Sequence, residues 1–418
     1  MVTARGARLP RPFGAVPPIV LAGAGALAAG TVCGLVLQVT GVADTSALVD
    51  SRSYVFGAGL LLAVGLYGST YGIDLKALRA DLRGVVAAVT LGVVLKAALI
   101  TGTMLLVFRR PEALVLGVAV AQIDPLSVAA LGRNDRMSPR ARSLLTAWAS
   151  FDDPMTVLLT LYLAGMAYPL TGGTGTPGIT GGGTGGYLAG LGLNAALLAG
   201  VLLLWFTGRR LVSRAPDTPP ARRTVGGAAV LLVGALLVLA AAQQLMLAVA
   251  LAGLVVRSTV LGKVLDRAVG GAYLAAFSAL GLLLAHGVAW WPGLVLGVAA
   301  FGAQAVVALT VMPLFVKGLA RTDRIELGLG QQNGITAVLI ALTLERDFPG
   351  TAATVGPAVI TVNILYGAGQ ALRSRPPRLR RGGGAGEDAG ELAAEPGRQS
   401  LYGQETRGEN VLERRSVA

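Results

Sequence analysis

Two adjacent aspartates, Asp152 and Asp153, lie in the middle of an apolar segment, residues 143–166, that is long enough to cross a membrane. A carboxylate at the centre of a bilayer costs roughly 2.5–3.5 kcal/mol to insert, and two neighbouring carboxylates also repel each other. Ionisable groups at this depth are functional by default, so the pair predicts a site for protons or cations. The alternative is a carboxyl pair that is neutralised by hydrogen bonds between helices.

A proline follows the pair directly. Because proline has no backbone N–H, Pro154 leaves the carbonyl of Ser150, four residues earlier, without its helical partner. That carbonyl and the Ser150 hydroxyl lie one turn from the aspartates, and hard cations such as Na⁺ prefer oxygen ligands of these kinds. We expect a Na⁺ site at Asp153 and Asp152, with Ser150 as an auxiliary ligand. A cation and a proton would compete for Asp153.

A third acid, Asp124, lies in the preceding apolar segment, residues 111–131, and is followed by Pro125. The proline frees the carbonyl of Ala121 and biases Asp124 away from helical geometry. A broken helix at membrane depth is tolerated only where it is buried or lines a cavity, and an acid can neutralise the positive end of a half-helix. The alternative is a simple proline kink with Asp124 facing water.

The composition identifies the elements that must position these residues. Hydrophobic residues make up 54% of the chain and charged residues only 14%, with a mean hydropathy of +0.67, which excludes an ordinary soluble domain. With about 20 residues per crossing, the chain is predicted to be an all-α polytopic membrane protein of about twelve transmembrane helices. These are residues 15–39, 54–73, 84–107, 111–131, 142–166, 186–207, 224–241, 245–259, 268–287, 290–315, 325–344 and 351–372.

The basic residues predict the orientation. The formal charge is +13, and twelve spans with a cytoplasmic N-terminus place most loop lysines and arginines inside. We therefore expect a plasma-membrane protein with a cytoplasmic segment 1–14, a transmembrane domain 15–372 and a disordered cytoplasmic tail 373–418. The expected partners are membrane lipids and not nucleic acid, and the basic start of the tail suits anionic lipid.

Several motifs together resemble the cation/proton antiporter superfamily. Residues 123–125 (Ile-Asp-Pro) are similar to its T-D-P or V-D-P motif, and residues 152–154 (Asp-Asp-Pro) to its N-D or D-D ion-binding motif. Residues 72–79, 247–258 and 328–342 resemble further family elements. Each motif is weak alone, but their order and spacing are specific.

The resemblance implies a fold of two inverted repeats, in which two discontinuous helices, spans four and eleven, cross near the membrane midplane. It also implies a mobile core and a homodimer. Asp153 would bind ion and proton, with Asp152 beside it and Asp124 stabilising the crossing. In span eleven, Gln332 and Asn333 would cap a half-helix end; the alternative for them is ordinary hydrogen bonding between helices.

Two positions depart from the family pattern. Where the family has a basic residue on span ten this chain has Gln304, and Trp148 replaces the Glu that the electroneutral branch has four residues before its Asn-Asp pair. Lys96, near the centre of span three, is the candidate replacement for the missing basic residue. Half of the hydrocarbon core of the bilayer is ~15 Å thick, so the lysine side chain is too short to bring its ammonium group to water. We hypothesise that it pairs with Asp152 or Asp124; the alternative is a water-facing or interfacial lysine.

The residues and the resemblance together predict a secondary antiporter that exchanges Na⁺ for H⁺ by alternating access, with K⁺ and Li⁺ left open, and a role in pH homeostasis. The alternatives are a Na⁺- or H⁺-coupled carrier of an organic solute on the same fold, a channel and a sensor. The sequence has no nucleotide-binding fingerprint, zinc-ligand cluster or nucleophile triad, so we expect neither an enzyme nor a cofactor. Ion selectivity and stoichiometry are not determined by the sequence.

Overall fold

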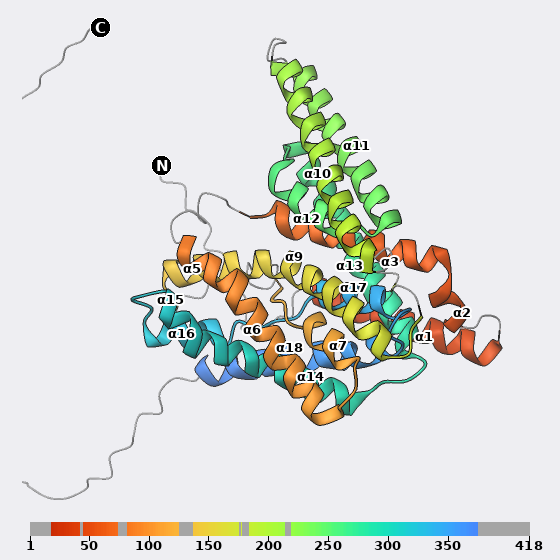
Figure 1. The fold of residues 1–418 in the computed structure, drawn as a ribbon, viewed down its shortest axis with the longest axis vertical. Helices are drawn as coiled ribbons and strands as arrows, with labels where there is room; N and C mark the ends of the chain where they lie inside the picture. The colour runs from red at the N-terminus through yellow and green to blue at the C-terminus, as the bar shows by residue number, and fades with distance from the viewer. Residues whose placement is uncertain are drawn as a thin grey trace, which may run out of the picture. The chain divides into compact units, whose positions relative to one another are not determined.

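The computed structural model describes residues 18–41, 45–73, 82–124, 137–174, 177, 184–213 and 219–374, and every regular element within these ranges is a helix (Figure 1). Several predicted segments lie outside the described residues. These are the N-terminal segment 1–14, residues 74–79 of the motif after the second predicted span, residues 125–131 of the fourth span, and the tail beyond residue 374.

The first half of the chain forms a series of helices. They are α1 (Pro18–Thr40), α2 (Thr45–Asp50), α3 (Arg52–Tyr71), α5 (Leu82–Ala87), the π-helical turn η1 (Ala88–Gly92), α6 (Val93–Phe108), α7 (Ala113–Ala119), α9 (Pro139–Leu170) and α10 (Thr184–Ser213). α5, η1 and α6 follow one another without a break. α7, in contrast, ends after seven residues, and the chain continues without helix through residues 120–124.

The second half also contains both long and short helices. It contains α11 (Pro219–Gln243), α12 (Met246–Val255), α13 (Thr259–Leu284), α14 (Trp290–Val306), the π-helical turn η4 (Val307–Val311), α15 (Met312–Phe315), α16 (Arg321–Gly328), α17 (Ile335–Leu344) and α18 (Thr351–Ser374). α11 and α12 are separate helices, as the sequence predicts. The helix interruption in this half lies between α16 and α17, at residues 329–334.

Eight helices in the described part of the chain are long and apolar enough to cross a membrane, so the chain is a multi-pass membrane protein. They span Leu21–Thr40, Arg52–Tyr71, Arg83–Phe108, Ala189–Leu211, Thr224–Gln243, Thr259–Leu284, Trp290–Phe315 and Thr351–Arg373. The other four predicted spans overlap α7, α9, α12, and α16 with α17. α12 and α17 have ten residues each, fewer than the ~20 that a bilayer requires. The number of twelve spans therefore stays a prediction.

Close packing between helices depends on small residues. α1 lies along α13, and a Cβ at Gly30 would overlap the Ser278 carbonyl while one at Gly281 would overlap the Leu27 carbonyl. Glycine allows two backbones to approach in this way, which is how helices gain packing energy in lipid, where apolar burial between them gains little.

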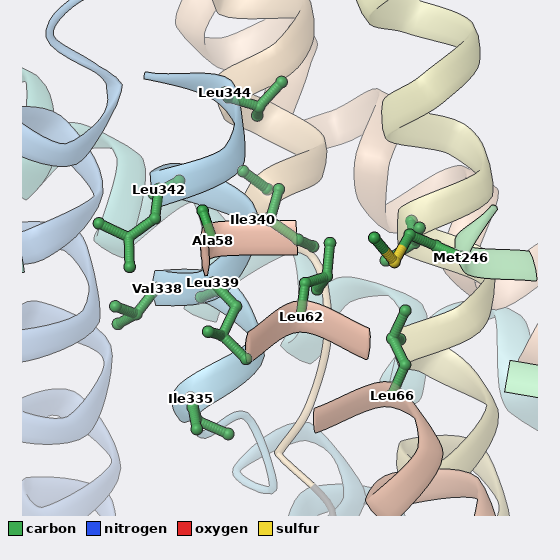
Figure 2. Packing of buried hydrophobic residues seen from close by; sticks show 14 of the residues in the cluster. Ala58, Leu62, Leu66, Met246, Ile335, Val338, Leu339, Ile340, Leu342 and Leu344 are labelled. Carbon is green, nitrogen blue, oxygen red and sulfur yellow. The ribbon is translucent and has the colours of Figure 1, made fainter. Parts of the chain in front are cut away.

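The short helix α17 lies inside the protein. All of its residues except Thr343 are buried, and α3 packs against it, with Leu62 beside Ile340 (Figure 2). A helix that is apolar on all sides must be enclosed. The first turn of α17, and the break that precedes it, are therefore held at a fixed place in the core.

Candidate functional site

Helix α9 carries the aspartate pair. Ser138 caps its N-terminus by accepting the Ala141 N–H at 3.2 Å, and the helix continues through Pro154 without a break. Asp152 and Asp153 are both completely buried. The two carboxyl groups point to different partners, because neighbouring residues of a helix do not share a face.

Asp152 forms an ion pair with Lys96. The Lys96 ammonium lies 2.7 Å from Asp152 Oδ2, and the same oxygen accepts the backbone N–H of Ile123 at 3.0 Å. Lys96 is completely buried, and its Nζ lies 5.3 Å from the centre of the Trp148 ring, within reach of a cation–π interaction. Of the two partners that the sequence left open for Lys96, the structure places Asp152 against it.

Asp153 meets a different helix. Its Oδ2 accepts a hydrogen bond at 3.1 Å from the hydroxyl of Thr336, in the first turn of α17. The second oxygen, Oδ1, of Asp153 and the Oδ1 of Asp152 are buried, and neither has a hydrogen-bond partner among the described residues. Buried polar atoms are normally paired, so two unpaired carboxylate oxygens on adjacent residues call for an occupant.

The two helix breaks are bonded directly to each other. The Asp124 N–H donates to the Gln332 carbonyl at 2.8 Å, and the Asn333 side-chain amide donates to the Val120 carbonyl at 3.1 Å. The Gln331 amide donates to the Gln122 carbonyl at 2.9 Å. Non-helical backbone at membrane depth must find its hydrogen bonds inside the protein, and these contacts supply them.

Each of three half-helix ends lies against a group of opposite polarity. The Asp124 carboxyl lies so close to Gly334, the residue before α17, that a Cβ there would collide with it, which places a carboxyl at the positive end of α17. The amide donor of Asn333 reaches Val120 at the carbonyl end of α7. Gln304 Nε2 donates at 3.0 Å to the Leu327 carbonyl, at the carbonyl end of α16.

Ser150, Gln332 and Asn333 form hydrogen bonds around the site and not to the carboxyl groups of the aspartate pair. The Ser150 hydroxyl is buried and donates to the Thr146 carbonyl of its own helix at 2.7 Å. Gln332 contributes its backbone carbonyl to the contact with Asp124, whereas the hydrogen bonds of the Asn333 side chain go to Val120 and Gln331.

Sequence reasoning missed two contributors to the site. The hydroxyl of Thr336 follows Gly334 by two residues, and a polar residue in the first turn of a half-helix would have been the signal. The N–H of Ile123 is a backbone group and carries no signal of its own in the sequence. In the part of the chain that the structure describes, no group of three or more His, Cys, Asp or Glu side chains could hold a resident metal ion.

Comparison with known proteins places this chain in a family. The family model described as sodium/hydrogen exchanger, transmembrane, matches residues 1–369. Among solved structures, the fold is similar to that of the sodium proton antiporter MjNhaP1 from Methanocaldococcus jannaschii at pH 8, with a TM-score of 0.54 and 17% identity over 85% of this chain and 95% of that chain. None of the curated proteins matches the sequence. The order of motifs around Asp124 and Asp153 thus led to the right family, and the chain belongs to the sodium/hydrogen exchangers.

Proposed function

We propose that the protein is a secondary antiporter that exchanges a monovalent cation, in the first place Na⁺, for H⁺ at Asp153. The observation that carries the proposal is the pair of buried Oδ1 atoms on Asp152 and Asp153, which have no hydrogen-bond partner among the described residues. Family membership supports cation/proton antiport in general. The assignment to these two residues is our own.

The proposed chemistry is competition for one carboxyl group. A proton on Asp153 occupies a lone pair that a cation needs, so the cation enters as the proton leaves, and one positive charge replaces another. The two Oδ1 atoms, the Thr336 hydroxyl and the carbonyl of Ser150 that Pro154 leaves without a helical donor offer oxygen ligands of the kind that a hard cation prefers.

The half-helix ends suit a supporting role. Asp124, Asn333 and Gln304 hold the ends of α17, α7 and α16 through charge or hydrogen bonds. We propose that they keep the two breaks in register while the site changes sides. A site on bonded breaks can be presented to one side or the other as a unit, which is the basis of alternating access.

The proposal extends to the whole membrane domain. It includes twelve spans, inverted repeats with the fourth and eleventh spans crossing, and a homodimer in the plasma membrane with both termini in the cytoplasm. Within it, residues 15–372 carry the exchange, and the segments 1–14 and 373–418 flank it. Lipids are its other expected partners.

Transport by the purified protein tests the proposal. Proteoliposomes with an internal pH dye and an imposed pH gradient should show H⁺ flux that depends on and saturates with Na⁺, Li⁺ or K⁺. Proton flux driven only by an organic solute would assign the protein to solute transport instead. Conduction without coupling would indicate a channel, and no flux with any cation would refute exchange.

A further inference from the structure

We infer that Lys96 sets the valence of the cation that the site accepts. It cancels one of the two charges of the aspartate pair, so the pair presents a single net negative charge to the cation, which suits a monovalent ion and disfavours a divalent one. The inference rests on the proposed function, because it concerns the cargo of the same site.

Ligand chemistry alone does not separate Na⁺ from Ca²⁺. Both are hard cations that take carboxylate, carbonyl and hydroxyl oxygens. For Ca²⁺, affinity rises with the number of charged ligands in the site. The net charge that the protein brings to the cation is therefore the feature that distinguishes the two ions here.

Lys96 and Asp152 behave as a unit of zero net charge. Their charged atoms lie 2.7 Å apart and both side chains are completely buried. Among the described residues, Lys96 Nζ donates one hydrogen bond, to Asp152, which is therefore its direct ion-pair partner. Separating such a buried pair leaves an uncompensated charge, which is strongly unfavourable, and the pair therefore persists.

Asp153 supplies the charge that remains. Its contact with Thr336 is a hydrogen bond from a neutral hydroxyl, and no cationic side chain of the described residues lies within ion-pair distance of it. Asp124, the other nearby acid, lies against the positive end of α17, which offsets part of its charge. Gln304, at the position of the family's basic residue, is neutral and is bonded to Leu327.

The geometry lets Lys96 cancel charge without removing a ligand. The hydrogen bonds that Lys96 and the Ile123 N–H donate to Asp152 both reach Oδ2, and Oδ1 has no hydrogen-bond partner among the described residues. The Trp148 ring beside the ammonium helps to hold it there. Asp152 can therefore contribute an oxygen to a cation while contributing no net charge.

Competition between Ca²⁺ and Na⁺ in proteoliposomes tests the inference. Ca²⁺ should not inhibit Na⁺-driven proton flux in the wild type. In Lys96→Gln, where two carboxylates face the cation without compensation, Ca²⁺ should compete about 10- to 100-fold more strongly. Ca²⁺ that inhibits wild type and Lys96→Gln equally would overturn the inference.

A charge-matched variant supplies the control. The double variant Lys96→Gln with Asp152→Asn removes both charges, restores a net charge of minus one and leaves no lone buried ion, so it should fold. Because Asp152 is a proposed ligand, calorimetry on the purified protein measures Ca²⁺ binding directly, and the double variant should bind Ca²⁺ no more tightly than the wild type. Tight Ca²⁺ binding by either the wild type or the double variant would contradict the inference, whether or not Lys96→Gln alone folds. If the wild type shows no Na⁺ exchange at all, the proposed function itself is refuted.

Discussion

The backbone N–H of Asp124 donates to the carbonyl of Gln332 at 2.8 Å, so two helix breaks about half the chain apart are bonded directly to each other. The carboxyl group of the same aspartate lies against Gly334 at the start of α17. One residue thus connects the breaks through its backbone and neutralises a half-helix end through its side chain. The arrangement explains why an acid that is costly to bury lies here.

Gly334→Ala should be harmful for this reason. The new methyl group would collide with the Asp124 carboxyl and force the two breaks apart, which we expect to cost about 1–3 kcal/mol of stability and most of the exchange rate. Thermal unfolding in detergent and proteoliposome flux measure the two effects. Gly102→Ala is the matched control, because a Cβ at Gly102 meets no described atom within 4 Å. Equal melting temperatures for the two variants would contradict the account.

Thr336→Val should weaken cation binding. Valine has nearly the shape of threonine but lacks the hydroxyl that donates to Asp153, a hydrogen bond to a charged group worth about 1.5–3 kcal/mol. We expect the KM for Na⁺ to rise about tenfold or more, and Thr336→Ser to retain most of the affinity. Thr343→Val, on the same helix, removes a hydroxyl that reaches only carbonyls of α17 and should leave KM unchanged.

Gln304 should tolerate only side chains that can donate a hydrogen bond. Gln304→Leu removes one of the hydrogen bonds to the Leu327 carbonyl, which still accepts the Gly330 N–H at 3.2 Å, so we expect a cost of about 0.5–1.5 kcal/mol. Gln304→Glu should be worse, since it brings a carboxylate to the carbonyl end of α16, which already carries a partial negative charge. Chemical or thermal denaturation ranks the variants, and a Glu variant more stable than the Leu variant would contradict this interpretation.

Two ion pairs of different burial should differ in their contribution to stability. Arg373 lies 2.8 Å from Glu326, whose side chain is only 1% exposed, whereas Arg346 lies 3.8 Å from the largely exposed Asp50. Arg373→Ala should cost about 1–3 kcal/mol because it removes a cation from a buried carboxylate. Arg346→Ala should cost about 0–1 kcal/mol. Similar melting temperatures for both variants would refute the distinction.

The sequence was most informative about the site at ionisable side chains, whose burial in an apolar span has the highest free-energy cost. Asp152, Asp153, Asp124 and Lys96 could be selected from their residue types alone, because an ionisable group in an apolar span needs a partner or a function. Pro125 and Pro154, which follow these acids, drew attention to the fourth and fifth spans because proline leaves a backbone carbonyl without its helical donor. The family assignment followed from the order of these motifs, and comparison with known proteins confirmed it.

What the sequence could not supply are the partners across the fold. Thr336 meets Asp153 from a helix 183 residues later, and Gln304 meets Leu327 through a bond between separate helices. Backbone donors such as the Ile123 N–H leave no trace in residue type. These contacts depend on which faces of the helices meet, and hydropathy does not encode that when helices are apolar on every side.

The most direct test of the central claim is the number of protons released when Na⁺ binds to the purified protein, measured by calorimetry in buffers of different ionisation enthalpy. The wild type should bind Na⁺ and release a proton to the buffer, because cation and proton compete for Asp153. Asp153→Asn, whose amide carries no exchangeable carboxyl proton, should fold but show neither Na⁺ binding nor proton release. Na⁺ binding with normal proton release in Asp153→Asn would contradict the account.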